Sequence, residues 1–170
     1  MPISTITSKS TTGVISSGTA VASTSGTSID FTGIPSWVKR ITVMFNGVST
    51  NGTSPVQIQI GDSGGIETTN YLGTGVYQIT GTNATSMSSG FLIESSTNTS
   101  AAAVRNGFAT IVLLSNNIWS FVGNFGRSDN GSVISGYGGK TLSDILDRVR
   151  ITTVNGTDTF DAGTINILYE

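Results

Sequence analysis

The stretch IDFTGIPSWVKRITVMFNGVS, from Ile29 to Ser49, carries the clearest strand pattern in the chain. Between Ile41 and Phe45 every second residue is apolar, and an alternation with a period of two places one set of side chains in a core and the other set outside. Turn-forming residues bound this part of the stretch, with Gly33-Ile34-Pro35-Ser36 before it and Asn46-Gly47 at its end. The stretch therefore predicts a half-buried β-strand.

Further apolar segments predict the other strands. Val56 to Ile60 alternates and follows a turn, so we expect it to pair with the opening strand as a hairpin. Phe108 to Leu114 is apolar on both faces, as in a central strand, and Trp119 to Phe125 is its expected hairpin partner. Weaker patterns predict a short edge element at 66–69 or 71–76 and strands within 87–94, 133–135, 148–153 and 165–169.

The composition favours strands over helices. Only 11% of the 170 residues are charged, against about 25% in an average domain, and the 22 glycines argue against long helices. About eight strands separated by turns predict an all-β fold, an antiparallel β-sandwich resembling a jelly roll. We assign 29–170 to this single domain and 1–28, which is rich in Ser, Thr and Gly, to an extended N-terminal arm.

The charges are few and nearly balanced. Eight basic residues against ten acidic ones give a net charge of −2, and no dense basic run is present, so we do not expect nucleic acid as a partner. No apolar run approaches the length of about 20 residues that spans a bilayer. The first residues show no secretory pattern. We therefore expect no membrane partner and synthesis in a cytoplasm.

Cysteine and histidine are both absent from the chain. Their absence removes disulfides, Cys/His zinc sites, imidazole bases and thiol nucleophiles. We expect a protein that is not an enzyme, with no catalytic residue and no cofactor.

Two short motifs resemble functional sites and are better explained by structure. Gly61 to Gly65 reads GDSGG, the local sequence around the nucleophile of chymotrypsin-like proteases, but that serine needs a histidine base. We expect a Gly-rich hairpin loop there. Gly136 to Thr141 resembles a phosphate loop, but Ile134 stands where the motif needs glycine. The following residues 141–148 have apolar residues at helical spacing, yet we expect only a loop or single turn, and we interpret 136–141 as a mobile surface loop.

The acidic residues give a weak case for a metal ion. Asp144 with Asp147, and Asp158 with Asp161, have spacings that allow each pair to approach one Ca²⁺ ion. No EF-hand spacing is present, and turn hydrogen bonds explain the Asx residues around Asn155. We expect no metal site.

The aromatic residues and the glycosylation motifs also have a structural explanation. Trp37, Tyr71, Tyr77 and Tyr137 lie in or beside predicted loops, where they can stack on sugars, but packing in the core or at its rim is the favoured interpretation. Trp37 together with Phe45 is expected to fix the core. The N-x-[ST] matches are expected by chance in this composition, and they start at Asn51, Asn83, Asn98, Asn130 and Asn155.

Two segments carry a family resemblance. IDFTGIPSWVKRITVMFNGVSTNGTS, from Ile29 to Ser54, and LDRVRITTVNGTDTFDAGTINILYE, from Leu146 to Glu170, resemble a domain of structural proteins of tailed bacteriophages, often found at the ends of tail-fibre-like proteins. The resemblance implies a virion component, usually assembled as a trimer. It transfers no functional residue, because the shared residues have the pattern of strands and turns. Outward apolar residues such as Met44 suit a subunit interface in such a trimer.

The resemblance leaves three functional hypotheses. The first is a capsid decoration, or cement, protein whose arm binds the major capsid protein while the sandwich projects as a knob. The second is a small tail-fibre or receptor-binding component that binds other tail proteins. The third is a carbohydrate-binding module for a host surface glycan. In the first two hypotheses the protein is located in the virion.

Overall fold

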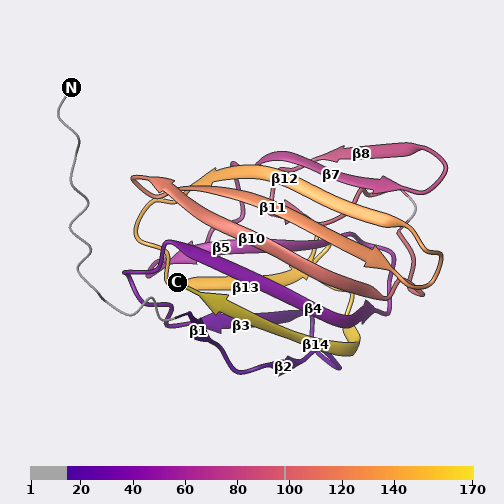
Figure 1. The fold of residues 1–170 in the computed structure, drawn as a ribbon, viewed down its shortest axis with the longest axis horizontal. Coiled ribbons are helices and arrows are strands. Elements are labelled where there is room, and N and C mark those ends of the chain that lie inside the picture. Colours follow the sequence, from indigo (N-terminus) through magenta and orange to yellow (C-terminus); the bar gives the residue numbers. More distant parts are fainter. Residues whose placement is uncertain (1–14, 98) are drawn as a thin grey trace, which may run out of the picture.

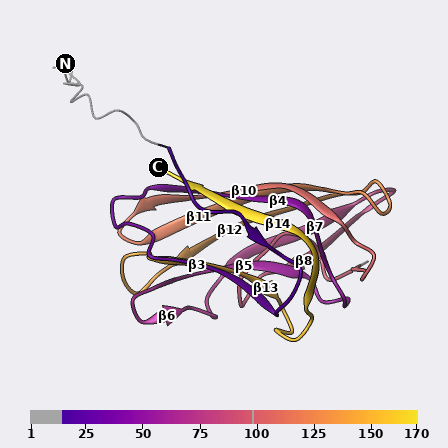
Figure 2. The ribbon, with the colours of Figure 1, turned by 90° about the horizontal axis from the view of Figure 1, so that it is seen from below.

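The computed structural model describes residues 15–97 and 99–170. Within these residues the regular structure consists of strands in two antiparallel sheets that pack face to face (Figure 1; Figure 2). The larger sheet has, in spatial order, β1 (Ser16–Ser17), β14 (Phe160–Tyr169), β4 (Arg40–Thr50), β10 (Arg105–Ser115), β11 (Ile118–Arg127), β12 (Val133–Thr141), β7 (Leu72–Gln78) and β8 (Thr82–Ser86), with β2 (Val21–Ala22) also on β14. The smaller sheet has β3 (Ser28–Thr32), β13 (Arg148–Thr153), β5 (Val56–Asp62) and β6 (Gly65–Ile66), with β9 (Phe91–Leu92) also on β5. The predicted all-β sandwich is confirmed, while the jelly-roll connection pattern stays a prediction.

The opening strand is β4, and its alternation matches its burial. Ile41, Val43 and Phe45 are buried between the sheets, while the residues between them face outward. Apolar side chains of the smaller sheet, such as Ile58 and Ile151, meet them from the other side of the core. Each such side chain contributes about 1.5–3 kcal/mol when fully buried. This shared core holds the two sheets together.

The predicted hairpin between the opening strand and Val56–Asp62 is wrong. β4 lies between β14 and β10 in the larger sheet, whereas β5 lies between β13 and β6 in the smaller one. The chain crosses from one sheet to the other in the loop between these strands. All residues of β5 are buried, because loop segments cover its outward face as well.

The second predicted hairpin is confirmed. β10 and β11 pair antiparallel, and β10 lies in the interior of the larger sheet. Its outer face is nevertheless open, because no layer covers that side of the sheet, and Phe108 is 54% exposed. The predicted central position of this strand is confirmed, although its outward apolar side chains are exposed.

The chain continues from β11 into β12, which is longer than predicted. The segment Gly136 to Thr141, expected as a mobile loop, forms the second half of this strand and pairs with β7 and β11. Glycine is needed in this segment for close packing, because the backbone of Leu92 lies directly against Gly136. The loop expected after it is confirmed, since 142–147 contains neither helix nor strand.

Three smaller predictions differ from the structure. Of the two alternatives for a short edge element, 71–76 corresponds to β7, which β8 pairs on its far side, and 66–69 overlaps β6 at the edge of the smaller sheet by Ile66 alone. The predicted strand within 87–94 is reduced to Phe91–Leu92. Trp37 does not fix the core: it lies in the turn before β4, 53% exposed, with its ring centroid 5.9 Å from that of Tyr169.

The described part of the N-terminal arm lies along one edge of the larger sheet (Figure 1). β1 and β2 pair with β14. Between these two strands the Gly18 N–H donates to Ile167 O at 2.8 Å, and just after β2 the Ser23 N–H donates to Gly163 O at 2.9 Å. The edge of β14 is thereby paired from residue 163 to residue 169. Residues 1–14 of the predicted arm lie outside the described residues.

Candidate binding surfaces

The GDSGG motif forms the tight hairpin that was predicted. Asp62 ends β5 and pairs with Gly65, the first residue of β6. Ser63 is exposed in the turn, and the Asp62 carboxylate turns inward, where it accepts a hydrogen bond from the Gly64 N–H at 2.8 Å. The motif stabilises a turn.

Asp62 belongs to a partly buried polar network at one end of the sandwich. The Ser143 hydroxyl lies 2.7 Å from Asp62 Oδ2 and 2.8 Å from Glu67 Oε1. Glu67 forms an ion pair with Lys140, whose aliphatic chain is buried and whose ammonium lies 5.5 Å from the centre of the Tyr71 ring. The network ties the end of β12 to two loops and closes this end of the core.

The network shifts the acidity of its members. Burial alone raises the pKa of Glu67, but hydrogen bonds from Lys140 and Ser143 outweigh it and hold that pKa below its ordinary value of 4.5. The hydrogen bond from Ser143, with that from Gly64, lowers the pKa of Asp62 from its ordinary 3.8. Burial raises the pKa of Tyr71. The carboxylates of Glu67 and Asp62 are therefore ionised at neutral pH and accept hydrogen bonds.

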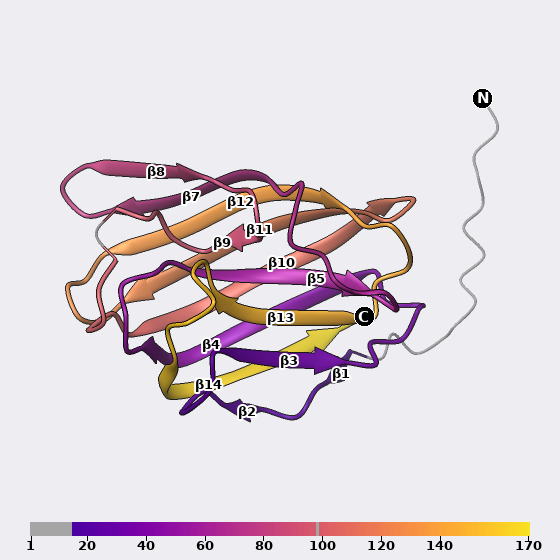
Figure 3. The ribbon, with the colours of Figure 1, turned by 180° about the vertical axis from the view of Figure 1, so that it is seen from behind.

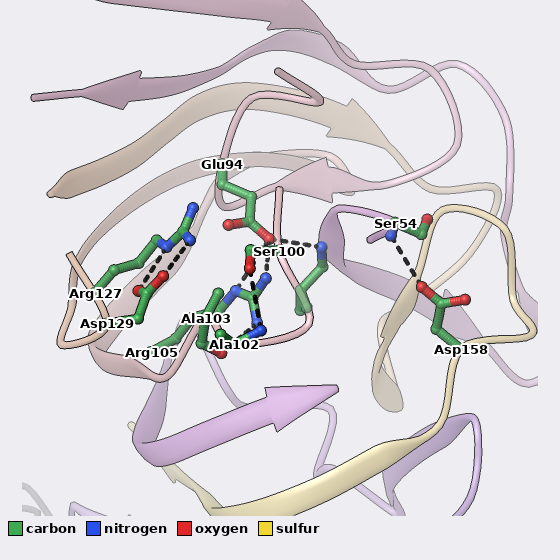
Figure 4. A network of polar contacts seen from close by, with 10 residues as sticks. Ser54, Glu94, Ser100, Ala102, Ala103, Arg105, Arg127, Asp129 and Asp158 are labelled. Carbon is green, nitrogen blue, oxygen red and sulfur yellow. Dashed lines mark hydrogen bonds and ion pairs between the residues drawn. The ribbon is translucent and has the colours of Figure 1, made fainter. Parts of the chain in front are cut away.

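A second buried network lies at the opposite end of the larger sheet (Figure 4). Arg105, at the start of β10, is fully buried and donates from Nε and Nη2 to Glu94 Oε1 at 3.0 and 2.6 Å. Its Nη1 donates to Ala103 O at 3.2 Å, and the Val56 N–H donates to the same Glu94 oxygen at 3.2 Å. Sequence patterns give no signal for this pair, because Glu94 and Arg105 lie in separate, irregularly connected segments.

Arg127 extends this network towards the surface. Its Nη2 lies 2.6 Å from Asp129 Oδ2, which holds the pKa of Asp129 below its ordinary value of 3.8. Its guanidinium also lies 5.5 Å from the centre of the Tyr77 ring, and Asn130 Nδ2 donates to the Tyr77 hydroxyl at 3.1 Å. The polar side chains of Arg127, Asp129, Tyr77 and Asn130 thus contact one another at this end of the sheet.

The acidic pairs considered for calcium do not converge. Asp147 pairs with Arg148, and Asp161 bonds to the Ser49 hydroxyl. Asp158 accepts the Ser54 N–H at 2.9 Å (Figure 4). Among residues 15–97 and 99–170, no three acidic side chains come together as metal ligands. Asn155 Oδ1 accepts the N–H groups of Thr157 and Asp158, which confirms the predicted turn bonds.

The aromatic side chains considered for sugar stacking lie at separate places. Tyr71 and Tyr77 are buried in the two networks, which confirms the favoured interpretation for them. Tyr137 is 50% exposed on the outer face of β12, opposite Val122. Trp37 lies beside the ring of Tyr169 on the C-terminal strand. Of the N-x-[ST] sites, that at Asn98 lies outside the described residues.

The smaller sheet, with β3, β13 and β5 labelled in Figure 3, has grooves lined largely by polar side chains on its outer face. A groove of about 370 Å³ is lined by Asp30, Thr68 and Arg150 among others, and an adjoining one of about 310 Å³ shares Thr68 and Arg150. Its charged groups are already paired, since Arg150 donates to both oxygens of Asp30 at 2.7 and 2.8 Å. Gln59 Nε2 donates to Ser89 O at 2.9 Å. The grooves thus offer few free polar groups to a ligand.

The outer side of β10, β11, β12, β7 and β8, part of the larger sheet drawn in Figure 1, carries apolar and uncharged polar side chains. The charged residues of β10, β11, β12, β7 and β8 are Arg105, Arg127 and Lys140, and all three are buried on the inner side. The side chains that alternate with them outward include several exposed apolar ones, namely Leu72, Phe108, Leu114, Ile118, Val122, Val133 and Tyr137. We call this surface the uncharged face.

No family model, curated protein or solved structure matches this chain. The resemblance to tailed-phage structural proteins therefore stays a prediction. In the part of the chain that the structure describes, no helix has the length and apolarity needed to cross a membrane.

Proposed function

We propose that this chain is a non-enzymatic structural protein of a tailed-bacteriophage virion, a capsid decoration protein. In this proposal the N-terminal arm binds the major capsid protein, and the sandwich projects from the shell as one knob of a homotrimer. The resemblance of Ile29–Ser54 and Leu146–Glu170 to tailed-phage domains supplies the setting.

The observation that carries the proposal is the way the described arm binds a sheet edge. Ser16, Ser17, Val21 and Ala22 pair with β14 through backbone groups, and the arm consists mainly of small hydroxyl-bearing and glycine residues. Binding by strand addition needs main-chain hydrogen bonds and little side-chain chemistry. A segment of this composition is therefore suited to dock on exposed strands of another protein.

The charge distribution supports a structural role as well. The charged side chains named above form local ion pairs, such as Asp30 with Arg150 on the surface and Glu94 with Arg105 in the core. Charged side chains that are paired within the chain stabilise the fold. They are not arranged around a common point where a substrate would react.

The proposal is tested by removing the first part of the arm. A variant lacking residues 2–14 keeps β1 and β2 and is expected to fold, as measured by circular dichroism and thermal unfolding. It is expected not to join capsid shells assembled from the major capsid protein, while the full chain joins them. Incorporation of the shortened chain at the level of the full chain would overturn the arm as the anchor.

The copy number in the particle separates decoration from a tail position. Quantitative mass spectrometry of purified particles is expected to give a copy number proportional to that of the major capsid protein. A small number of copies confined to isolated tails would favour the tail-fibre or receptor-binding role instead.

A further inference from the structure

The uncharged face is the feature of the molecule that the fold itself does not explain. Val122 lies between Thr110 and Tyr137 in one row across the sheet, and Met44 lies beside Phe108 in the next. Uncharged polar side chains such as Thr110 and Asn124 lie between these apolar ones. Exposed apolar side chains gathered on neighbouring strands and rimmed by polar ones mark an interaction site.

The charge pattern limits what can cover this face. A nucleic acid needs cationic side chains, and the outward side chains of β10, β11, β12, β7 and β8 include none. A strongly charged protein partner would bury charges without counterions, which is costly. A second uncharged face needs no cationic side chains and buries no charges. Another copy of this chain provides such a face.

The size of the face is also sufficient. Five neighbouring strands about 4.8 Å apart span about 24 Å, and a strand of nine residues, as in β12, is about 30 Å long. The resulting area of about 700 Å² is close to the roughly 800 Å² that each partner buries in a stable interface.

We propose that copies of this chain associate through their uncharged faces, with the outer sides of β10, β11, β12, β7 and β8 turned towards a shared symmetry axis. Identical faces turned to one axis form a closed assembly. This inference deepens the proposed function, on whose homo-oligomer it rests, by naming the surface that forms it. The polar smaller sheet then faces away from the axis.

The test compares charged substitutions on the two outer faces of the full chain. Val122→Glu places a carboxylate in the middle of the uncharged face, and Thr32→Glu places one on the exposed side of β3 in the smaller sheet as the matched control. Tyr137→Ser removes apolar area without adding charge and serves if Val122→Glu does not fold. Circular dichroism and thermal unfolding check the fold of each variant.

Masses are measured by light scattering over a dilution series. The wild-type chain and Thr32→Glu are expected to show a multiple of the 17.5 kDa chain mass, while folded Val122→Glu or Tyr137→Ser shifts to the monomer or dissociates at much higher concentration. A monomeric wild-type chain would overturn the inference. So would folded face variants that stay as associated as the control.

The same variants separate this inference from the decoration proposal. Incorporation into shells tests the arm, and the solution mass tests the face. A wild-type oligomer that dissociates in Val122→Glu supports the inference even if the chain never joins a capsid shell.

Discussion

Gly136 on β12 lies directly opposite Gly75 on β7, and the backbone of the β9 segment packs against both glycines. A Cβ atom on Gly136 would lie 2.0 Å from Leu92 O, and one on Gly75 would lie 2.3 Å from Glu94 O. Real Cβ atoms do not approach a carbonyl oxygen so closely, so any side chain at either position displaces this segment. The two glycines allow backbone to lie directly on the inner face of the larger sheet and help to place Glu94 beside Arg105.

The first prediction follows from this contact. Gly136→Ala is expected to lower the free energy of unfolding by about 1–3 kcal/mol, because the added methyl group overpacks the contact with Leu92. Gly126→Ala, on β11, is the control, since its Cβ would meet no atom within 4 Å, and it should change stability by less than about 0.5 kcal/mol. Urea unfolding followed by fluorescence measures both. Equal midpoints for the two variants would contradict the packing role of Gly136.

The second prediction concerns the buried ion pair. Arg105→Met leaves the Glu94 carboxylate in the core without its cation and is expected to cost about 3–5 kcal/mol. Arg150→Met breaks the exposed pair with Asp30 and should cost about 0–1 kcal/mol. Urea unfolding of both variants gives the comparison.

A double variant isolates the uncompensated charge as the cause. Replacing Glu94 by Leu in the Arg105→Met background removes that charge, so it should recover much of the lost stability. If the double variant is less stable than Arg105→Met, the loss comes from packing and not from charge.

The third prediction concerns acid stability. The folded pKa values of Asp62, Glu67 and Asp129 lie below their ordinary values of 3.8, 4.5 and 3.8. A lowered folded pKa stabilises the fold above the unfolded pKa, and this stability is lost as the pH falls through the folded value. The free energy of unfolding should therefore be steady above about pH 5 and fall progressively below about pH 4.5.

Glu67→Gln tests this assignment within one network. The variant loses the ion pair with Lys140, so it should be less stable than the wild type at pH 7, and its further loss between pH 5 and pH 3 should be smaller. Chemical unfolding at a series of pH values measures both effects. If the free energy of unfolding falls as steeply between pH 5 and pH 3 in the variant as in the wild type, Glu67 does not contribute to the acid dependence.

The fourth prediction measures what the described arm contributes. Removing residues 2–22 takes away β1 and β2 and leaves β14 as an unpaired edge, whereas removing 2–14 leaves them in place. The longer deletion should have the lower unfolding midpoint, because the bond from Gly18 N–H to Ile167 O and the packing of Val21 on the core are lost. Scanning calorimetry of the two variants gives the difference, and equal midpoints would mean that β1 and β2 add nothing to stability.

The strand content was predictable because it depends on neighbours in the chain. The alternation of Ile41, Val43 and Phe45 and the turn between β10 and β11 both lie within a few residues of each other. The same local logic identified GDSGG as a turn. Local patterns gave the wrong prediction for Gly136 to Thr141. A glycine-rich segment looks the same in the sequence whether it forms a loop or a strand against which another backbone packs closely.

Composition and periodicity are properties of the chain alone, and they were enough to predict an all-β domain with few charges, no cysteine and no histidine. Only the folded chain shows which sheet each strand joins, that Glu94 meets Arg105 and Glu67 meets Lys140, and that the outward side chains of β10, β11, β12, β7 and β8 form one uncharged face. A period of two tells which residues share a side of a strand. Which strands become neighbours, and whether a side faces core or solvent, depends on contacts between residues far apart in the chain.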